Sequence, residues 1–293
     1  MHHFFTRLIA NSEHSYFDET TESARLIQMD LLIPGNILYV TLANSLFTSD
    51  GTESTVIAGH PSDVGYQEGI REEAIFDNIR GFAQISSLQV IVSDQKNNCL
   101  RMIDRTTDST SPFSGVCDSV DSPLFRPYGV MLDKKNSSHI FATVPTSVVT
   151  VNMETGNIST FYDSTPNPVQ YFTQAPDGDV FVSYNHVIYK ISYFSRELTL
   201  ISGDSDFGSA DGTLLEARYN APRELQFLTE YTLLIADMKN NMLRLIDLSA
   251  ENVTSIEVCQ SDMPGCRPMS LLMTNDTLFV GNGFTPIQKF TCE

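Results

Sequence analysis

Positive charge is scarce in this sequence. It has 18 Lys and Arg residues against 36 Asp and Glu residues, so its formal net charge at pH 7 is −18. A chain with this balance repels phosphate backbones, and no basic stripe runs along it, so we expect no nucleic acid among its partners. The acidic surplus fits an extracellular or calcium-rich setting, and it equally serves plain solubility.

Long hydrophobic runs are also missing. No stretch approaches the roughly 18 consecutive apolar residues of a membrane-spanning helix, so we expect no membrane insertion by this segment. The apolar run at residues 1–5 is too short for a secretory signal. If the protein is secreted, we therefore expect its signal peptide to be absent from this chain. With 41% apolar residues, the chain can form the core of one large domain.

The features that usually mark an enzyme are few. The six histidines are scattered, no Cys-x₂-Cys pair suits zinc, and no Gly-x-Ser-x-Gly motif marks a serine nucleophile. We therefore predict no catalytic residues. A metal-dependent lyase or hydrolase is the alternative, with His14, His60 and His186 as the histidines that a fold could bring to one face.

Two stretches of the sequence repeat one another. Residues 93–104 (SDQKNNCLRMID) match residues 236–247 (ADMKNNMLRLID), at an offset of 237 − 94 = 143. The same offset aligns further residues upstream: Gly65 with Gly208, Gly69 with Gly212, Glu73-Ala74 with Glu216-Ala217, and Arg80 with Arg223. Such self-similarity indicates a repeat architecture.

A shorter period divides this repeat. Apolar runs that end in a turn recur about every 40–50 residues, which is the usual length of a propeller blade. Each unit alternates Val-, Ile-, Phe- and Tyr-rich runs with Asp-, Asn-, Gly- and Ser-rich gaps, which predicts four short strands. The sequence thus predicts a single all-β domain over residues 1–293. It is a six-bladed β-propeller with blades at roughly 25–59, 76–117, 124–163, 168–203, 219–259 and 264–292.

The last unit is one strand short. Residues 264–292 provide three strands, and residues 6–11 resemble the outer-strand segments at 55–59 and 199–203. We therefore expect residues 1–24 to supply a closing strand and loop that complete the sixth blade. Pairing the first strand with the last removes the open sheet edges.

A family resemblance rests on the repeated residues. A Gly-rich linker with a Glu-Ala pair, followed by a strand and then by Asp-x-x-Asn-x-x-Leu-Arg-x-Ile-Asp, resembles the NHL repeat of invertebrate-type extracellular proteins. The resemblance implies a propeller that binds other molecules. The family also includes metal-dependent amidating lyases, but no ordered set of His, Arg and Tyr residues matches their site here. The sequence also resembles RNA-binding propellers, but its net charge of −18 argues against binding of RNA.

Five cysteines need an explanation. Cys99 opens the third strand of its unit and Cys117 closes the fourth, so an antiparallel hairpin would bring them within disulfide distance. Cys259 and Cys266 flank a short loop and form the second predicted pair. Cys292 has no predicted disulfide partner; it is either a free thiol or belongs to a longer parent chain. The alternative is that all five are buried thiols of a cytosolic propeller.

Four Asn-x-Ser/Thr sequons are candidate glycosylation sites: Asn136, Asn157, Asn252 and Asn275. All fall in turns between the first and second or the third and fourth strands of their units. In a four-stranded meander these turns lie on one face of the disc, which we call the turn face. With the disulfides, they predict a secreted glycoprotein whose opposite face is open for contact.

The opposite face carries the blade linkers and the turns between second and third strands, and we call it the linker face. Loops on a rigid scaffold commonly bind partners, with aromatic and Arg side chains as anchors. The predicted binding residues are Asp63, Tyr66, Tyr184, His186, Phe207 and Arg218. We expect a non-catalytic extracellular module that binds a protein or a glycan.

The repeated aspartates, Asp94 and Asp237, have two interpretations. They could be calcium ligands or catalytic acids, but Asx side chains at such turns usually bond to nearby backbone. We therefore expect Asp94 and Asp237 to hold their hairpins, with Arg101 and Arg244 within reach. No cofactor is expected, and a structural calcium ion in the axial channel is the one metal left open.

Overall fold

The computed structural model describes residues 9–10, 26–33, 36–41, 44–49, 54–165, 169–258, 266–274, 277–282 and 287–291. These residues form six antiparallel sheets and two three-residue 3₁₀ helices, η2 (Arg71–Glu73) and η3 (Met238–Asn240). We number the sheets one to six in chain order.

The first sheet consists of β2 (Leu26–Ile33), β3 (Asn36–Thr41), β4 (Ser45–Ser49) and β5 (Ser54–Ala58). The second consists of β6 (Gly69–Ile70), β7 (Ile79–Gln84), β8 (Gln89–Asp94), β9 (Cys99–Asp104) and β10 (Ser109–Gly115). The third consists of β11 (Val130–Leu132), β12 (His139–Val144), β13 (Ser147–Asn152) and β14 (Ile158–Asp163).

The fourth sheet consists of β15 (Tyr171–Gln174), β16 (Val180–Tyr184), β17 (Val187–Ile191) and β18 (Leu198–Gly203). The fifth consists of β19 (Gly212–Thr213), β20 (Pro222–Phe227), β21 (Thr232–Asp237), β22 (Met242–Asp247) and β23 (Asn252–Glu257). The sixth consists of β24 (Pro268–Met273), β25 (Thr277–Asn282), β26 (Gln288–Thr291) and β1 (Ile9–Ala10).

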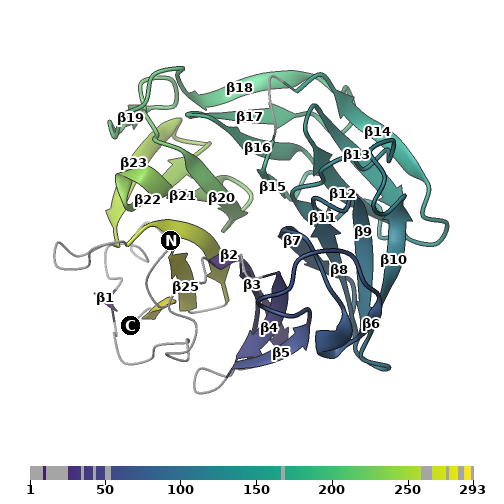
Figure 1. The fold of residues 1–293 in the computed structure, drawn as a ribbon. Coiled ribbons are helices and arrows are strands. Elements are labelled where there is room, and N and C mark those ends of the chain that lie inside the picture. Colours follow the sequence, from purple (N-terminus) through teal and green to yellow (C-terminus); the bar gives the residue numbers. More distant parts are fainter. Residues whose placement is uncertain are drawn as a thin grey trace.

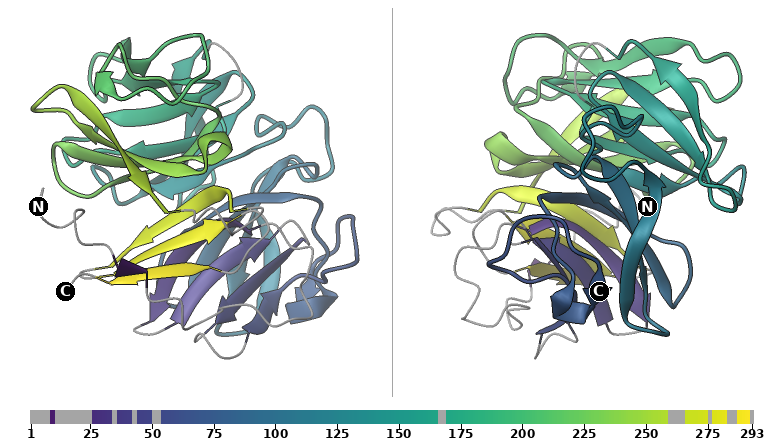
Figure 2. Two further views of the ribbon diagram at one scale, coloured as in Figure 1. Left: turned by 90° about the vertical axis from the view of Figure 1, so that its left-hand side faces the viewer. Right: turned by 45° about the vertical axis from the view of Figure 1, so that its right-hand side comes forward.

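The sheets stand around a common centre, each with its first long strand innermost (Figure 1). The inner strands contact those of neighbouring sheets: β2 lies against β7 and β24, β7 against β11, and β20 against β15 and β24. Side views show the sheets twisting from the centre to the rim (Figure 2). The prediction of an all-β β-propeller is therefore confirmed.

In β8, β12, β16, β21 and β25, the second strands of their sheets, nearly all residues are buried on both faces, because each sheet is packed between two others. In β8, five of the six residues from Gln89 to Asp94 are buried, and β21 shows the same pattern. The outer strands are more polar, and β14 and β23 keep most of their residues partly exposed. Apolar side chains thus concentrate where neighbouring sheets meet.

An apolar cluster fills each space between neighbouring sheets. Between the first and second sheets it includes Leu46 and Phe82, and between the fourth and fifth it includes Phe181 and Leu233. A further cluster joins Met29 and Phe47 of the first sheet to Leu272 and Phe279 of the sixth. The first and last sheets along the chain therefore pack against each other.

The N-terminal strand lies where the sequence predicts it. In β1, Ile9 pairs with Thr291 and Ala10 with Phe290 of β26, in antiparallel register. The rest of the predicted closing segment, residues 1–8 and 11–24, lies outside the described residues.

Two linkers add a fifth strand that the sequence analysis missed. In the second sheet β6 pairs with the outer strand β10, and in the fifth β19 pairs with β23. Both short strands come from the Gly-rich linkers, which fold back over an outer edge. Covering an edge strand removes unpaired backbone groups that could pair with other chains.

Repeated Asn and Gly residues shape the linker-face ends of the sheets. Asn98 and Asn241 adopt φ values of 59° and 58° in the turns between second and third strands, a conformation that Asn tolerates. Gly59 and Gly203 end the outer strands at φ values of 90° and 91°. A Cβ atom on Gly203 would lie 2.5 Å from the carbonyl oxygen of His186, so only glycine fits there.

Candidate functional site on the linker face

The repeated aspartates are structural, as predicted. Asp94 and Arg101 form an ion pair of 3.2 Å with both side chains fully buried, and Asp237 and Arg244 form the same pair at the same distance. Asn97 donates to Asp94 at 2.8 Å, and its amide also donates to the carbonyl oxygen of Gly65 in the linker. Burial raises the pKa of Asp94 to about 6, against the opposing effects of Asn97, the Asp77 backbone N–H and Arg101.

Each buried arginine also holds its linker in place. Arg101 donates to the carbonyl oxygens of Ile75 and Gln67, both at 2.6 Å, and its guanidinium lies 4.3 Å from the ring centroid of Phe76. Arg244 does the same in the fifth sheet and pairs with Asp211 as well. Phe76 and Tyr219 are fully buried beneath these linkers, as the sequence analysis expected.

The predicted binding residues separate into two groups. Asp63 and Tyr66 lie in the linker between β5 and β7. There Asp63 is 3.5 Å from His60 Nδ1, and the Tyr66 hydroxyl donates to Glu68 at 3.1 Å. Burial raises the pKa of the Tyr66 hydroxyl, with a further contribution from Glu68.

The second group lies between the fourth and fifth sheets. The rings of His186 and Phe207 have centroids 6.0 Å apart, and the backbone N–H of Ala221 donates to His186 Nδ1 at 3.4 Å. Phe207 is 71% exposed. Tyr184 stands two residues before His186 at the end of β16. The structure thus brings three of the six predicted residues together.

Arg218 is held by contacts within its own linker, and its part in binding stays a prediction. Its guanidinium donates to the carbonyl oxygens of the three residues before it in the chain and pairs with Asp204 at 3.2 Å. These contacts all lie inside the linker between β18 and β20. Arg218 therefore stabilises the linker that carries Phe207.

A cavity of about 400 Å³ opens beside the second group. It lies between the turn from β16 to β17 and the start of β20, and η3 contributes to its rim. The lining residues are Gln170, Tyr171, Ser183, Tyr184, Asn185, Ala221, Pro222, Arg223, Met238 and Lys239. We call it the linker-face cavity. Of the predicted binding residues, Tyr184 lines it.

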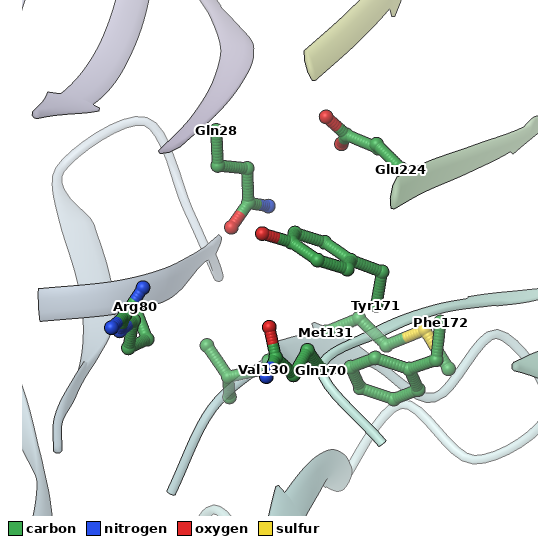
Figure 3. Close-up of a pocket in the computed structure, with 9 residues that line it drawn as sticks. Gln28, Arg80, Val130, Met131, Gln170, Tyr171, Phe172 and Glu224 are labelled. Carbon is green, nitrogen blue, oxygen red and sulfur yellow. The ribbon is translucent and has the colours of Figure 1, made fainter. Parts of the chain in front are cut away.

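A smaller cavity of about 60 Å³ lies deeper along the centre of the ring and shares Gln170 and Tyr171 with the linker-face cavity. Figure 3 shows the hydroxyl of Tyr171 pointing toward Gln28, with Arg80 and Glu224 on opposite sides. We call it the axial cavity. It contains polar side chains from several sheets, and none of them was singled out as a binding residue from the sequence.

The side chains around the axial cavity influence one another. Gln28 of β2 bonds to both backbone groups of Phe82 in β7, at 3.0 and 2.9 Å. Glu224 accepts from the Leu271 backbone N–H at 2.9 Å. Burial, with a smaller contribution from the neighbouring Asp30, raises the pKa of Glu224 to about 8, against the opposing effect of the hydrogen bond from Leu271. At neutral pH Glu224 is therefore mostly protonated and uncharged.

Tyr171 joins the two cavities. Its hydroxyl accepts a hydrogen bond from Arg223 Nη1 at 2.5 Å, and the Arg223 guanidinium lies 5.3 Å from its ring centroid. Burial raises the pKa of Tyr171, while the charges of Arg223 and Arg80 lower it. The sequence repeat aligns Arg80 with Arg223, but no binding site was predicted from these two residues. Both residues lie near the start of an inner strand, and this shared position is the sequence feature that could have indicated a site.

The predicted disulfide between Cys99 and Cys117 is confirmed, with Cα atoms 4.9 Å apart. Cys266 also takes part in a disulfide. Its predicted partner Cys259, and also Cys292, lie outside the described residues.

Three candidate sequons lie in the turns from which the turn face was predicted. Asn136 lies between β11 and β12, Asn157 between β13 and β14, and Asn252 at the start of β23. Asn136 and Asn157 are exposed and Asn252 is half-buried. Asn275 lies outside the described residues, and glycosylation itself stays a prediction.

No cluster of three or more His, Cys, Asp or Glu residues suited to a metal ion occurs in the described part of the chain. His60 and His186 lie in separate loops, and His14 lies outside the described residues. A structural calcium ion in the axial channel stays a prediction. In the same part of the chain, no helix is long and apolar enough to cross a membrane.

No family model matches this chain. Protein SUPPRESSOR OF QUENCHING 1, chloroplastic, of Arabidopsis thaliana is 20% identical to this chain in an alignment that covers 85% of this chain and 33% of that protein. The chain therefore spans about a third of the length of that relative.

Solved structures share the fold at low identity. An auxiliary nutrient binding protein from Bacteroides thetaiotaomicron is 12% identical with a TM-score of 0.71, covering 94% of this chain and 75% of that one. Virginiamycin B lyase from Staphylococcus aureus is 14% identical with a TM-score of 0.63, covering 94% and 98%. A chain of a nidogen/laminin complex is 12% identical with a TM-score of 0.60, covering 80% and 81%. These likenesses support the β-propeller fold.

Proposed function

We propose that this chain is a non-catalytic extracellular module that binds a protein through its linker face. The observation that carries the proposal is a set of large apolar side chains exposed in the linkers between sheets, which includes Val64, Val116, Val120, Phe125 and Phe207, each more than 40% exposed. Exposed aromatic and aliphatic side chains on rigidly held loops are typical anchors of protein interfaces.

The scaffold supports this function because it holds the linkers rigidly. Two of the linkers are held in place by hydrogen bonds to the buried pairs Asp94–Arg101 and Asp237–Arg244. The linker between β10 and β11 begins at the Cys99–Cys117 disulfide. A partner that binds such preformed loops loses little free energy to ordering them.

We also infer that the six sheets are the blades of a closed six-bladed ring of NHL type, with the blade boundaries predicted from the sequence. Two contacts support closure: the pairing of β1 with β26 and the apolar cluster between the first and sixth sheets. A closed ring leaves no apolar blade face in water.

Secretion is part of the proposal. The Cys99–Cys117 disulfide supports an oxidising compartment, where such bonds persist. Sequons at Asn136 and Asn157 would place glycans on the turn face and leave the linker face to the partner. The nidogen/laminin neighbour, a propeller crystallised with a protein, is consistent with this mode of binding.

Two phenylalanines on opposite faces provide a matched test. Phe207 lies in a linker and is 71% exposed, whereas Phe194 lies in the turn between β17 and β18 and is 84% exposed. The intact chain is screened against arrays of extracellular proteins and of glycans, and the affinity of any partner is then measured by surface plasmon resonance. We expect Phe207→Asp to weaken binding about tenfold or more, and Phe194→Asp to leave it within about twofold.

Two outcomes would contradict the proposal. A partner whose binding is lost in Phe194→Asp and kept in Phe207→Asp uses the turn face. Binding to glycans alone, with no protein partner, would assign the linker face to carbohydrate recognition. The second candidate function is a metal-dependent lyase or hydrolase, and it would be favoured by stoichiometric zinc or calcium in the purified chain.

A further inference from the structure

The linker-face cavity contains cationic groups in a protein that is otherwise strongly acidic. Arg223 lines it, Lys239 stands at its rim, and Arg80 lines the adjoining axial cavity. With a net charge of −18, the chain has twice as many acids as bases. Whether these cations have carboxylate partners decides what the cavity can bind.

Arg80 and Arg223 have no carboxylate within 4.0 Å in the described part of the chain, whereas Arg71, Arg101, Arg218 and Arg244 each pair with one. Arg105, Arg126 and Arg196 also lack a carboxylate there, but they do not line either cavity. Arg223 donates to the Tyr171 hydroxyl, and Arg80 has a contact of 3.5 Å with the Gln95 side chain. Both are half-buried. A half-buried guanidinium without a counter-ion keeps most of its hydrogen-bonding capacity for a ligand.

The acid that lines the axial cavity does not neutralise them. Glu224 faces the axial cavity, and its raised pKa of about 8 keeps most of it protonated at pH 7. The Tyr171 hydroxyl is also neutral, since burial raises its pKa. The positive charge of Arg223 is therefore uncompensated by these two groups.

The shape and lining of the cavity limit the ligand. Its volume of about 400 Å³ suits a small molecule and lies near the lower end of the roughly 300–1,000 Å³ range of such sites. The side chains of Tyr171, Tyr184 and Pro222 offer ring surfaces, and those of Gln170 and Asn185 offer amide groups. One guanidinium fork lines this cavity, which matches a planar carboxylate bound through two parallel hydrogen bonds.

We propose that the linker-face cavity binds a small organic carboxylate of about monosaccharide size. Arg223 holds the carboxylate, Lys239 attracts it at the rim, and the rings of Tyr171 and Tyr184 pack against the body of the ligand. The site is independent of the protein partner proposed above, because it can be occupied and measured with the isolated chain.

The test uses isothermal titration of the intact, disulfide-bonded chain with three probes. D-glucuronate carries the carboxylate, D-glucose is its neutral counterpart, and inorganic phosphate is a different anion. We expect heat of binding with glucuronate, none with glucose, and markedly weaker binding of phosphate. Since a hydrogen bond to a charged group contributes about 1.5–3 kcal/mol, Arg223→Gln should weaken glucuronate binding about tenfold or more.

Two further variants keep the test decisive. Lys239→Gln changes an exposed side chain and should weaken glucuronate binding about threefold, with less dependence on salt than in the parent chain. Arg105→Gln, a control in the turn between β9 and β10, should change nothing. If Arg223→Gln does not fold, as judged by circular dichroism, Lys239→Gln decides.

Several results would overturn the proposal. These are equal binding of glucose and glucuronate, phosphate binding as tight as glucuronate, no binding of glucuronate, or unchanged affinity in the folded Arg223→Gln or Lys239→Gln chain. None of these results bears on the protein partner, whose test depends on Phe207 and uses no small ligand.

Discussion

The buried ion pair under the first Gly-rich linker allows a quantitative prediction. Arg101→Met removes the guanidinium and keeps an unbranched side chain in its place. The change leaves the carboxylate of Asp94 buried without its cation, and the carbonyl oxygens of Ile75 and Gln67 without their donor. Each of these groups is desolvated in the folded chain and solvated in the unfolded one.

The expected loss follows from these groups. Removing one partner of a buried pair typically lowers the free energy of unfolding by about 3–5 kcal/mol, because the other charge stays buried and unpaired. Both side chains of this pair are fully buried. By contrast, Arg71 and Asp108 form an exposed pair at 2.7 Å, with side chains 62% and 37% exposed, and such pairs contribute about 0–1 kcal/mol.

Urea unfolding at pH 8, where the Asp94 carboxylate is ionised, measures the difference. The chain has no Trp, so far-ultraviolet circular dichroism and tyrosine fluorescence are the suitable signals. Arg101→Met should lose about 3–5 kcal/mol, and the control Arg71→Met at most about 1 kcal/mol. In the double variant Asp94→Asn, Arg101→Met, part of the loss should return, because no unpaired charge remains. Equal losses in Arg101→Met and Arg71→Met would refute this account of the pair.

Three further predictions concern other elements. Replacing Cys99 and Cys117 by Ser should lower the free energy of unfolding by about 3 kcal/mol, since the bridge spans 18 residues, and chemical denaturation checks it. The pKa of Glu224 is about 8 in the folded chain and 4.5 ordinarily, so the free energy of unfolding should fall as pH rises from about 4.5 to about 8. Because Glu224 is partly exposed, this fall should be smaller than for a fully buried carboxyl group. In Glu224→Gln, melting temperatures should depend less on pH than in the parent chain. Gly203→Ala should lower the melting temperature by several degrees, because its φ is 91° and the added Cβ would meet the His186 carbonyl; an unchanged melting curve would contradict this.

The repeat in the sequence was enough to predict the fold class and much of the scaffold. Asp94, Asn97 and Arg101 recur with their spacing at Asp237, Asn240 and Arg244, and the structure gives both sets the same contacts. Local patterns of this kind are predictable because all partners lie within a few dozen residues of one another. The pairing of Cys99 with Cys117 across one hairpin is predictable for the same reason.

The two cavities were not predictable in this way. Their linings combine residues from several sheets, such as Gln28, Met131, Tyr171 and Glu224, which no local spacing connects. The pKa of Glu224 depends on burial against β24 and on Asp30, two contacts that exist only once distant parts of the chain meet. Likewise, β6 and β19 depend on the outer edges of their sheets, which the linker sequences do not reveal.

Repetition alone does not separate scaffold from site. The pairs Asp94/Asp237 and Arg80/Arg223 both repeat at the same offset. The aspartates repeat together with their Asn and Arg partners, so each copy forms a self-sufficient cluster. In the described part of the chain the arginines repeat without an acidic partner within 4.0 Å, so their charges remain available in the two cavities. A repeated charged residue whose partner does not repeat with it is therefore the better candidate for ligand binding, and Arg223→Gln tests that distinction as directly as it tests the cavity.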